Sequence, residues 1–202
     1  MEIELSRVIN GVRFAVASAT LNASSKRLLV LQDGCPCRPG CYSCCYRMIY
    51  VSVAEALIIF DFLKTNKLWD ETRKRCVSLT KITQKSSPLS WFKMRIECPV
   101  LDPNTKMCSA YEVRPPPCST HFVKSDPEAC DPWSLKPIEY KSAGMTEIYD
   151  KYEKDIAKSL DGHGILSYRL PMVVALLFAE KINSKTKLKA NEIVSFIFNE
   201  LK

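Results

Sequence analysis

The sequence predicts a mainly α-helical protein in which helices pack around an irregular, proline-rich core of clustered cysteines, with little or no β-sheet. Three observations predict this fold. Apolar stretches near both ends of the chain have helical spacing, five of the ten cysteines fall within residues 35–45, and eight of the twelve prolines fall within residues 98–137. Proline removes an amide donor and disfavours the helical region for the residue before it, so regular elements should be rare in that segment.

The first half of the chain contains three predicted helices. Residues 3–21 place apolar side chains near helical spacing, which predicts an N-terminal helix and a linker within residues 1–34. Ser52, followed three residues later by Glu55, forms a capping box before an apolar run, which predicts a helix over residues 53–66. Residues 69–85 begin acidic and end basic, as suits a helix dipole, and predict another helix.

The C-terminal part, residues 140–202, is also predicted to be helical. Three stretches with helical patterns begin near Met145, Leu166 and Asn191, and Pro171 should mark a first turn or a kink in the middle one. A chain of 202 residues can bury one sizeable core. We therefore expect a single domain, residues 1–202, with a cysteine-cluster core over residues 35–130.

Composition indicates an ordinary globular protein. The chain is 47% hydrophobic and 9% aromatic, and its acidic N-terminus does not resemble a secretory signal, so we expect a cytoplasmic location. The two most apolar stretches, 53–63 and 170–179, are shorter than the ~20 residues that span a bilayer, which predicts no membrane partner. In a reducing cytosol, clustered thiols are more often metal ligands than disulfides.

A basic stretch accounts for the excess positive charge. The net charge is +7, and residues 62–95 contain nine Lys or Arg against two acidic residues. This stretch could bind an acidic partner or nucleic acid, although a solvated helix face is the simpler interpretation. The candidate nucleic-acid contacts are Lys64, Lys67, Arg73, Lys74, Arg75, Lys81 and Lys85.

The segment CPCRPGCYSCC, residues 35–45, contains the first group of candidate metal ligands. Cys37, Cys41 and Cys44 are separated by three and then two residues, so they can lie on one side of a helical or tight-turn backbone. The neighbouring Cys44 and Cys45 should point in different directions, which suggests that one of them serves a second centre or lies in the core. Cys35 could replace Cys37 as a ligand.

A second group lies downstream, where Cys98, Cys108 and Cys118 are each ten residues apart on predicted loops. Cys130 could complete a four-thiolate site, and His121 could be a ligand or a hydrogen-bonded histidine. Cys76 is most simply a buried residue of its helix. The predicted metal ligands are Cys37, Cys41, Cys44, Cys45, Cys98, Cys108, Cys118 and Cys130.

The spacing leaves two metals open. A zinc ribbon requires two short CxxC knuckles, and only the pair Cys41 and Cys44 supplies one. Three closely spaced cysteines with a remote fourth ligand are typical of a cubane iron–sulfur cluster. The expected cofactor is therefore a [4Fe-4S] cluster or Zn²⁺, with a preference for the cluster. CxxxCxxC also occurs in radical enzymes that cleave S-adenosylmethionine, but the repeated strand–helix units of their barrel are missing.

Two sequence blocks resemble a known family. The first is Cys37-x3-Cys41-x2-Cys44-Cys45 with the helix after it, and the second is CPVL, CSAY and RPPPC within residues 98–118. Together they resemble the zinc- or iron-chelating cysteine-cluster family, also called CxxCxxCC or YkgJ-like. The resemblance implies a chelated metal but no particular reaction, because most members have none assigned. It covers residues 35–122.

One better-defined relative group is the flagellin lysine N-methylases, which look like iron–sulfur proteins that methylate lysines with S-adenosylmethionine. Those enzymes are longer, and the present chain has six glycines and no GxGxxG-type loop to hold such a cofactor. The resemblance therefore does not imply that this chain has that activity.

Three functions follow as hypotheses. The first is a cytosolic metal-binding module for interaction, assembly or accessory work with a protein partner. The second is an iron–sulfur enzyme, either redox or a protein lysine N-methyltransferase, which should contain a cofactor pocket. Two histidines and scattered carboxylates form no recognisable acid–base constellation, so whether the protein is an enzyme stays open. The third is nucleic-acid binding through residues 62–95.

Overall fold

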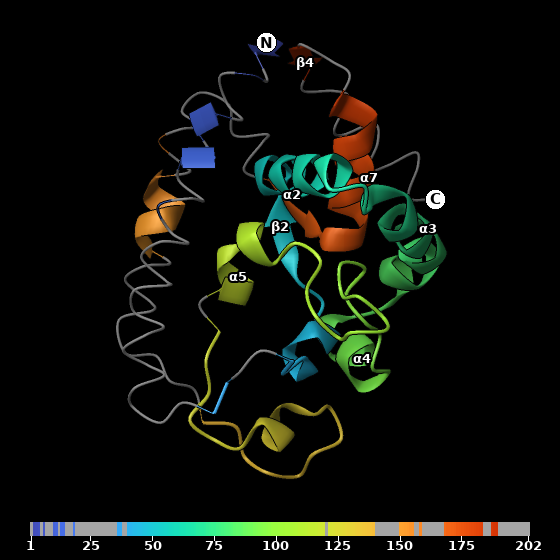
Figure 1. Cartoon of the computed structure of the whole chain (residues 1–202), viewed down its shortest axis with the longest axis vertical. Coiled ribbons are helices and arrows are strands. Elements are labelled where there is room, and N and C mark those ends of the chain that lie inside the picture. The colour runs from blue at the N-terminus through green and yellow to red at the C-terminus, as the bar shows by residue number, and fades with distance from the viewer. Residues whose placement is uncertain are drawn as a thin grey trace.

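The computed structural model describes two main stretches of the chain, residues 40–119 and 121–139, and several shorter ones. The shorter stretches are residues 2–4, 6, 10, 11, 13, 14, 18, 36, 37, 150–155, 158, 168–183 and 187–189. Within these residues the protein is mainly helical, with two small two-stranded sheets (Figure 1). The predicted fold class is confirmed.

Three long helices form the core: α2 (Val53–Thr65), α3 (Trp69–Lys85) and α7 (Met172–Asn183). The first two agree with the helices predicted over residues 53–66 and 69–85. Both α2 and α3 pack against α7, which crosses close to them in Figure 1. Most residues of α2 and α7 are buried, as expected for helices that are apolar on nearly every face.

Polar contacts fix how α3 lies against α7. The Trp69 indole donates a 2.8 Å hydrogen bond to the Glu180 carboxylate, and Arg73 forms an ion pair of 2.8 Å with the same side chain. The Trp69 ring also meets the Phe60 ring of α2 edge-on, with centroids 4.7 Å apart. One cluster of side chains thus joins all three helices.

Each of the two sheets pairs a strand from the first 52 residues with a strand from beyond residue 168. Strand β2 (Tyr50–Ser52) pairs with β3 (Arg169–Pro171), and these strands lead directly into α2 and α7. The Met172 amide at the start of α7 also donates to the Ile49 carbonyl at 2.9 Å. The beginnings of α2 and α7 are therefore held next to the segment that follows the cysteine run.

Strand β1 (Glu2–Glu4) pairs with β4 (Lys187–Lys189), which corrects the prediction of a helix from residue 3. The described residues between positions 6 and 18 are helical, as predicted. Residues 150–155 are helical, and Pro171 directly precedes α7 rather than interrupting it. The helix predicted near Asn191 lies outside the described residues.

Apart from α2 and α3, residues 40–139 contain only short elements, and the lack of long helices and strands within residues 98–137 agrees with the prediction from the prolines. The short helices are η1 (Ser43–Tyr46), α4 (Pro88–Lys93), η2 (Tyr111–Val113), α5 (Pro116–Ser119) and η3 (Pro127–Cys130). The single turn α5 begins inside the proline run, because proline is tolerated in the first turn of a helix. Of the helices described, none is long and apolar enough to cross a membrane.

The capping box at the start of α2 provides a test of this architecture. The Ser52 hydroxyl accepts the Glu55 amide at 3.1 Å, and the Glu55 carboxylate accepts the Ser52 amide at 2.7 Å. Both residues are buried, so Ser52→Ala should lower the free energy of unfolding by about 1 kcal/mol in urea titrations. Ser78→Ala, at an exposed position within α3, is the control, and an equal loss in both variants would contradict this role for the cap.

Candidate metal centre

The cysteine run folds as a turn followed by a single 3₁₀ turn. Gly40 has a φ of +84°, in the left-handed region that favours glycine, and lets the chain turn before Cys41. The helix η1 then places Cys44 and Cys45 on one short turn, closed by a 2.7 Å bond from the Cys45 amide to the Tyr42 carbonyl.

A tight hairpin carries the next two cysteines. The Asp102 amide donates to the Met107 carbonyl at 2.8 Å, and Leu101 forms an isolated antiparallel bridge with Cys108. The Asp102 carboxylate accepts the Asn104 and Thr105 amides at 2.9 and 2.7 Å, which fixes the turn at residues 102–105. This hairpin brings Cys98 and Cys108 to the same region.

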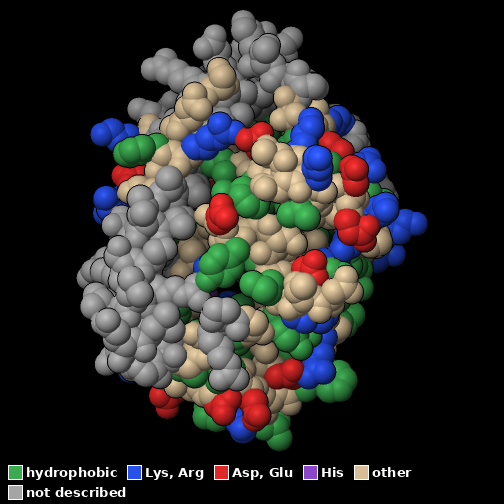
Figure 2. Space-filling model, in the orientation of Figure 1, with side chains coloured by type: hydrophobic (Ala, Val, Ile, Leu, Met, Phe, Trp, Pro, Cys, Tyr) green, Lys and Arg blue, Asp and Glu red, His purple; other side chains and the backbone are tan. Residues whose placement is uncertain are grey.

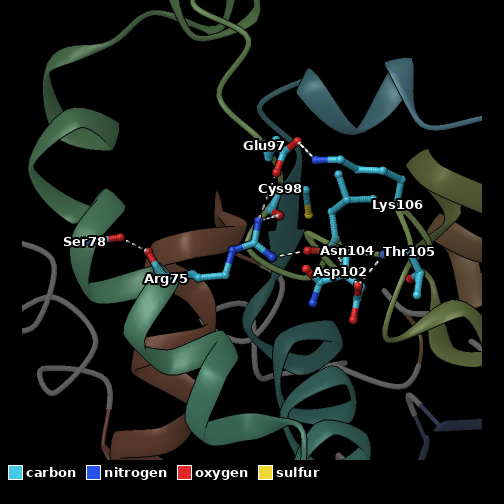
Figure 3. Close-up of polar contacts among 9 residues, drawn as sticks. Arg75, Ser78, Glu97, Cys98, Asp102, Asn104, Thr105 and Lys106 are labelled. Atoms are coloured by element: carbon cyan, nitrogen blue, oxygen red, sulfur yellow. Dashed lines mark hydrogen bonds and ion pairs between the residues drawn. The ribbon is translucent and has the colours of Figure 1, made fainter.

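One backbone hydrogen bond joins the hairpin to the cysteine run. The Cys98 amide donates to the Cys45 carbonyl at 2.8 Å. From the other side, the Arg75 guanidinium of α3 donates to the carbonyls of Cys98, at 3.0 Å, and Leu101 (Figure 3). Glu97 lies 3.7 Å from Arg75 and 2.5 Å from Lys106, so it links the two cations around the hairpin.

The last two cysteines belong to short helical turns. Cys118 lies on α5, where its amide donates to the Pro115 carbonyl at 2.8 Å. Cys130 is buried at the end of η3, whose first turn is capped by the Asp126 carboxylate through a 2.9 Å bond from the Glu128 amide. Because η3 packs against η1, Cys130 lies near the cysteine run.

These segments enclose a cavity of about 280 Å³. All eight cysteines predicted as ligands line it: Cys37, Cys41, Cys44, Cys45, Cys98, Cys108, Cys118 and Cys130. Its described lining includes the cationic Arg47, Lys106 and Arg114 but neither Asp nor Glu. Cys76 is buried in α3 and does not line the cavity, and Cys35 lies outside the described residues.

The eight thiols surround the cavity but do not meet at one point. Among the residues that the structure describes, no group of three or more His, Cys, Asp or Glu side chains is arranged to hold a metal ion. The donor set fits a soft metal, because thiolates are the ligands that zinc and iron–sulfur clusters prefer. Which thiols bind the metal stays a prediction.

The adjacent thiols of Cys44 and Cys45 interact with each other. A hydrogen bond from Cys45, together with the charges of Arg114 and Arg47, lowers the pKa of Cys44 to about 7 despite burial. The same bond raises the pKa of Cys45. The expectation that these side chains point in different directions is therefore wrong, because both line one cavity; the irregular turn η1 does not have the spacing of a regular helix or strand.

His121 lines the same cavity and contacts Arg47. Its Nδ1 lies 3.1 Å from an Arg47 guanidinium nitrogen, and burial followed by the Arg47 charge lowers the pKa of His121 to about 4. Guanidinium groups only donate hydrogen bonds, so Nδ1 accepts and the neutral ring carries its proton on Nε2. This arrangement favours His121 as a hydrogen-bond donor rather than a metal ligand.

Comparison with known proteins agrees with this site. Residues 36–133 match the family model CxxCxxCC, described as "Putative zinc- or iron-chelating domain". The resemblance predicted from the two cysteine blocks is thus confirmed, and this domain contains all eight thiols of the cavity. Searches of curated proteins and of solved structures gave no match.

Several of the predicted nucleic-acid contacts have partners within the protein. Arg73 binds Glu180, Arg75 binds the hairpin, and Lys74 lies 3.4 Å from Glu71. In Figure 2 the Lys and Arg side chains are interspersed with Asp and Glu on the face shown. Nucleic-acid binding stays a prediction.

The sequence did not predict that Arg75 binds the hairpin, because the carbonyl groups that it contacts lie more than twenty residues away in the chain. Arg75→Met keeps the apolar stem but leaves the Cys98 and Leu101 carbonyls without a charged donor. We expect a loss of about 2 kcal/mol in unfolding free energy and faster metal loss to a chelator. Lys74→Met, at a neighbouring exposed position, is the control; identical behaviour of both variants would show that Arg75 does not support the centre.

The assignment of His121 as a donor leads to a separate prediction. His121→Ala should retain the metal content of the unmodified protein, because eight thiols remain in the cavity. Elemental analysis of the purified variant measures this. A loss of metal in a folded variant, judged by an unchanged circular dichroism spectrum, would identify His121 as a ligand instead.

Proposed function

We propose that the CxxCxxCC domain holds iron–sulfur clusters and that the protein acts as an accessory or assembly module for a protein partner. The observation that supports this most directly is a single cavity lined by eight thiols and three cationic side chains, with no carboxylate among its described lining residues. Hard cations such as Mg²⁺ and Ca²⁺ prefer oxygen ligands, so this donor set argues against them.

The spread of the thiols supports a cluster over single zinc ions. With Zn–S bonds of ~2.3 Å, a tetrahedral zinc site needs its four sulfurs within about 4 Å of one another. The described thiols are distributed around a cavity of about 280 Å³. In an iron–sulfur cluster the ligands are more widely separated, because each thiolate binds a different iron.

The cationic lining suits the charge of such clusters. Thiolates bring more negative charge than the metal core neutralises, and nearby positive charge stabilises the thiolate form. Arg47 and Arg114 both help to lower the pKa of Cys44. When bound, the clusters would supply cross-links between irregular loops and, where solvent or a partner reaches them, electron transfer.

A module of this kind should depend on its metal for folding. Structural metal sites contribute of order 10 kcal/mol to the folded state in small zinc domains, and the loops of residues 86–139 contain few regular elements of their own. The proposed interaction role rests on a metal whose main effect would be to hold loops in place.

The metal identity can be tested on protein purified without oxygen. We expect a brown preparation with broad visible absorption that bleaches on reduction, and iron and acid-labile sulfide in equal amounts, because these are properties of bound clusters. Elemental analysis should find little zinc. A colourless preparation that contains only zinc would contradict the proposed clusters but not the thiol site itself.

A further inference from the structure

We propose that the surface around α4 is a docking site for a partner protein, and that it binds an acidic segment of that partner which also carries apolar side chains. This proposal rests on the proposed function, because it describes the kind of partner that such a module would serve. The α4 surface consists of five exposed residues: Lys85, Leu89, Lys93, Met94 and Trp133.

The charge of this region favours an acidic partner. Residues 72–96, which run from within α3 to just beyond α4, contain seven Lys or Arg and no Asp or Glu. Several of these cations bind acids from other segments, but within the described part of the chain Lys85 and Lys93 form no ion pair. Their positive charges therefore remain available to carboxylates on another molecule.

The apolar side chains of the α4 surface are largely open to solvent. Leu89 is 61% exposed, Met94 49% and Trp133 69%. Leu89 and Lys93 are four residues apart on α4, so they lie on the same face of that helix. In Figure 2, hydrophobic and cationic side chains lie next to each other at the lower right, where Figure 1 places α4. Apolar groups among cations indicate a protein interface, because nucleic-acid interfaces are more polar.

Trp133 is exposed but fixed in place. Its indole donates a 2.8 Å hydrogen bond to the Lys93 carbonyl at the end of α4, and its amide donates to the Asp131 carboxylate at 2.9 Å. The Arg95 guanidinium lies 4.8 Å from the centroid of the indole ring and pairs with Asp131. A ring held in this way loses little conformational freedom when a partner covers it. Trp133 should therefore be the main apolar anchor of the interface.

The same tryptophan lies beside the metal centre. Trp133, Arg95 and Cys41 are among the residues that line a surface groove of about 580 Å³. Cys41 also lines the metal cavity. A partner that covers Trp133 would thus lie next to the cysteine run and limit the access of solvent to it.

The three tryptophans of the chain provide the measurement. Trp69 and Trp91 are buried and Trp133 is exposed, so quenching of tryptophan fluorescence by acrylamide reports mainly on Trp133. The full-length protein, purified with its metal, is titrated with a synthetic amphipathic peptide of glutamate and leucine. We expect this peptide to bind, to protect Trp133 from acrylamide, and to bind more weakly as salt is added. The same peptide with lysine in place of glutamate should not bind.

Two variants and one control locate the binding site. Leu89→Ser removes an exposed apolar side chain and Lys93→Glu reverses a charge, and each should weaken binding of the acidic peptide by about tenfold. Lys151→Glu is the matched control, because it reverses an exposed charge in the helix of residues 150–155, which lies on the opposite side of the view in Figure 1 from α4. This variant should bind the peptide as tightly as the unmodified protein does.

The outcomes separate the docking site from its alternatives. No binding of the acidic peptide, or equal binding by Leu89→Ser, Lys93→Glu and Lys151→Glu, would overturn the docking site. Duplex DNA and vesicles that contain phosphatidylserine are tested in parallel, and tighter binding of either one than of the peptide would overturn the choice of a protein partner.

The metal content of the same samples tests the proposed function separately. Iron–sulfur absorption in a protein that does not bind the peptide would leave the proposed clusters intact and overturn only the docking site. Peptide binding by a protein that contains neither iron nor zinc would support the docking site and overturn the proposed metal function.

Discussion

The hydrogen bond from the Cys98 amide to the Cys45 carbonyl is the contact on which the rest of the site depends. It joins the cysteine run to the hairpin, two segments separated in the chain by α2, α3 and α4. Arg75 reinforces the junction by binding the Cys98 carbonyl from α3. The amide of Cys98 thus binds the cysteine run, and the carbonyl of the same residue binds α3.

This junction explains why the helical core and the cysteine loops form one unit. Strands β2 and β3 pair beside the cavity and lead directly into α2 and α7. Met172, the first residue of α7, belongs to both the hydrophobic core and the cavity wall. The loops bury little apolar surface of their own, so ordering them requires contacts with the helices and with a metal. Loss of either should loosen the loops before it melts the core.

The sequence predicted the parts of the protein that depend on local rules. The Ser52 capping box and the apolar run after it located α2, and the charge order of residues 69–85 located α3. Cysteine spacing and loop-forming prolines are also local signals. All eight ligands that were predicted from them line one cavity.

Contacts between distant residues could not be predicted in this way. Strand β1 forms because Lys187–Lys189 offers it a partner from the other end of the chain, which a helical pattern near residue 3 does not reveal. Arg75 was one of many cations in a basic stretch, and only the folded hairpin supplies the carbonyls that it binds. The contact between Cys44 and Cys45 likewise requires the geometry of the turn η1.

Charge is the remaining constraint on the cavity. Gathering several thiolates in one place is unfavourable unless positive charge lies nearby, and no carboxylate among the described lining adds to the repulsion. Arg47 and Arg114 provide full charges, and the start of α7 at Met172 adds the positive end of a helix dipole. His121 is neutral, so its hydrogen bond with Arg47 does not cancel the positive charge of the guanidinium. The cationic groups thus favour the deprotonated thiols that a metal requires.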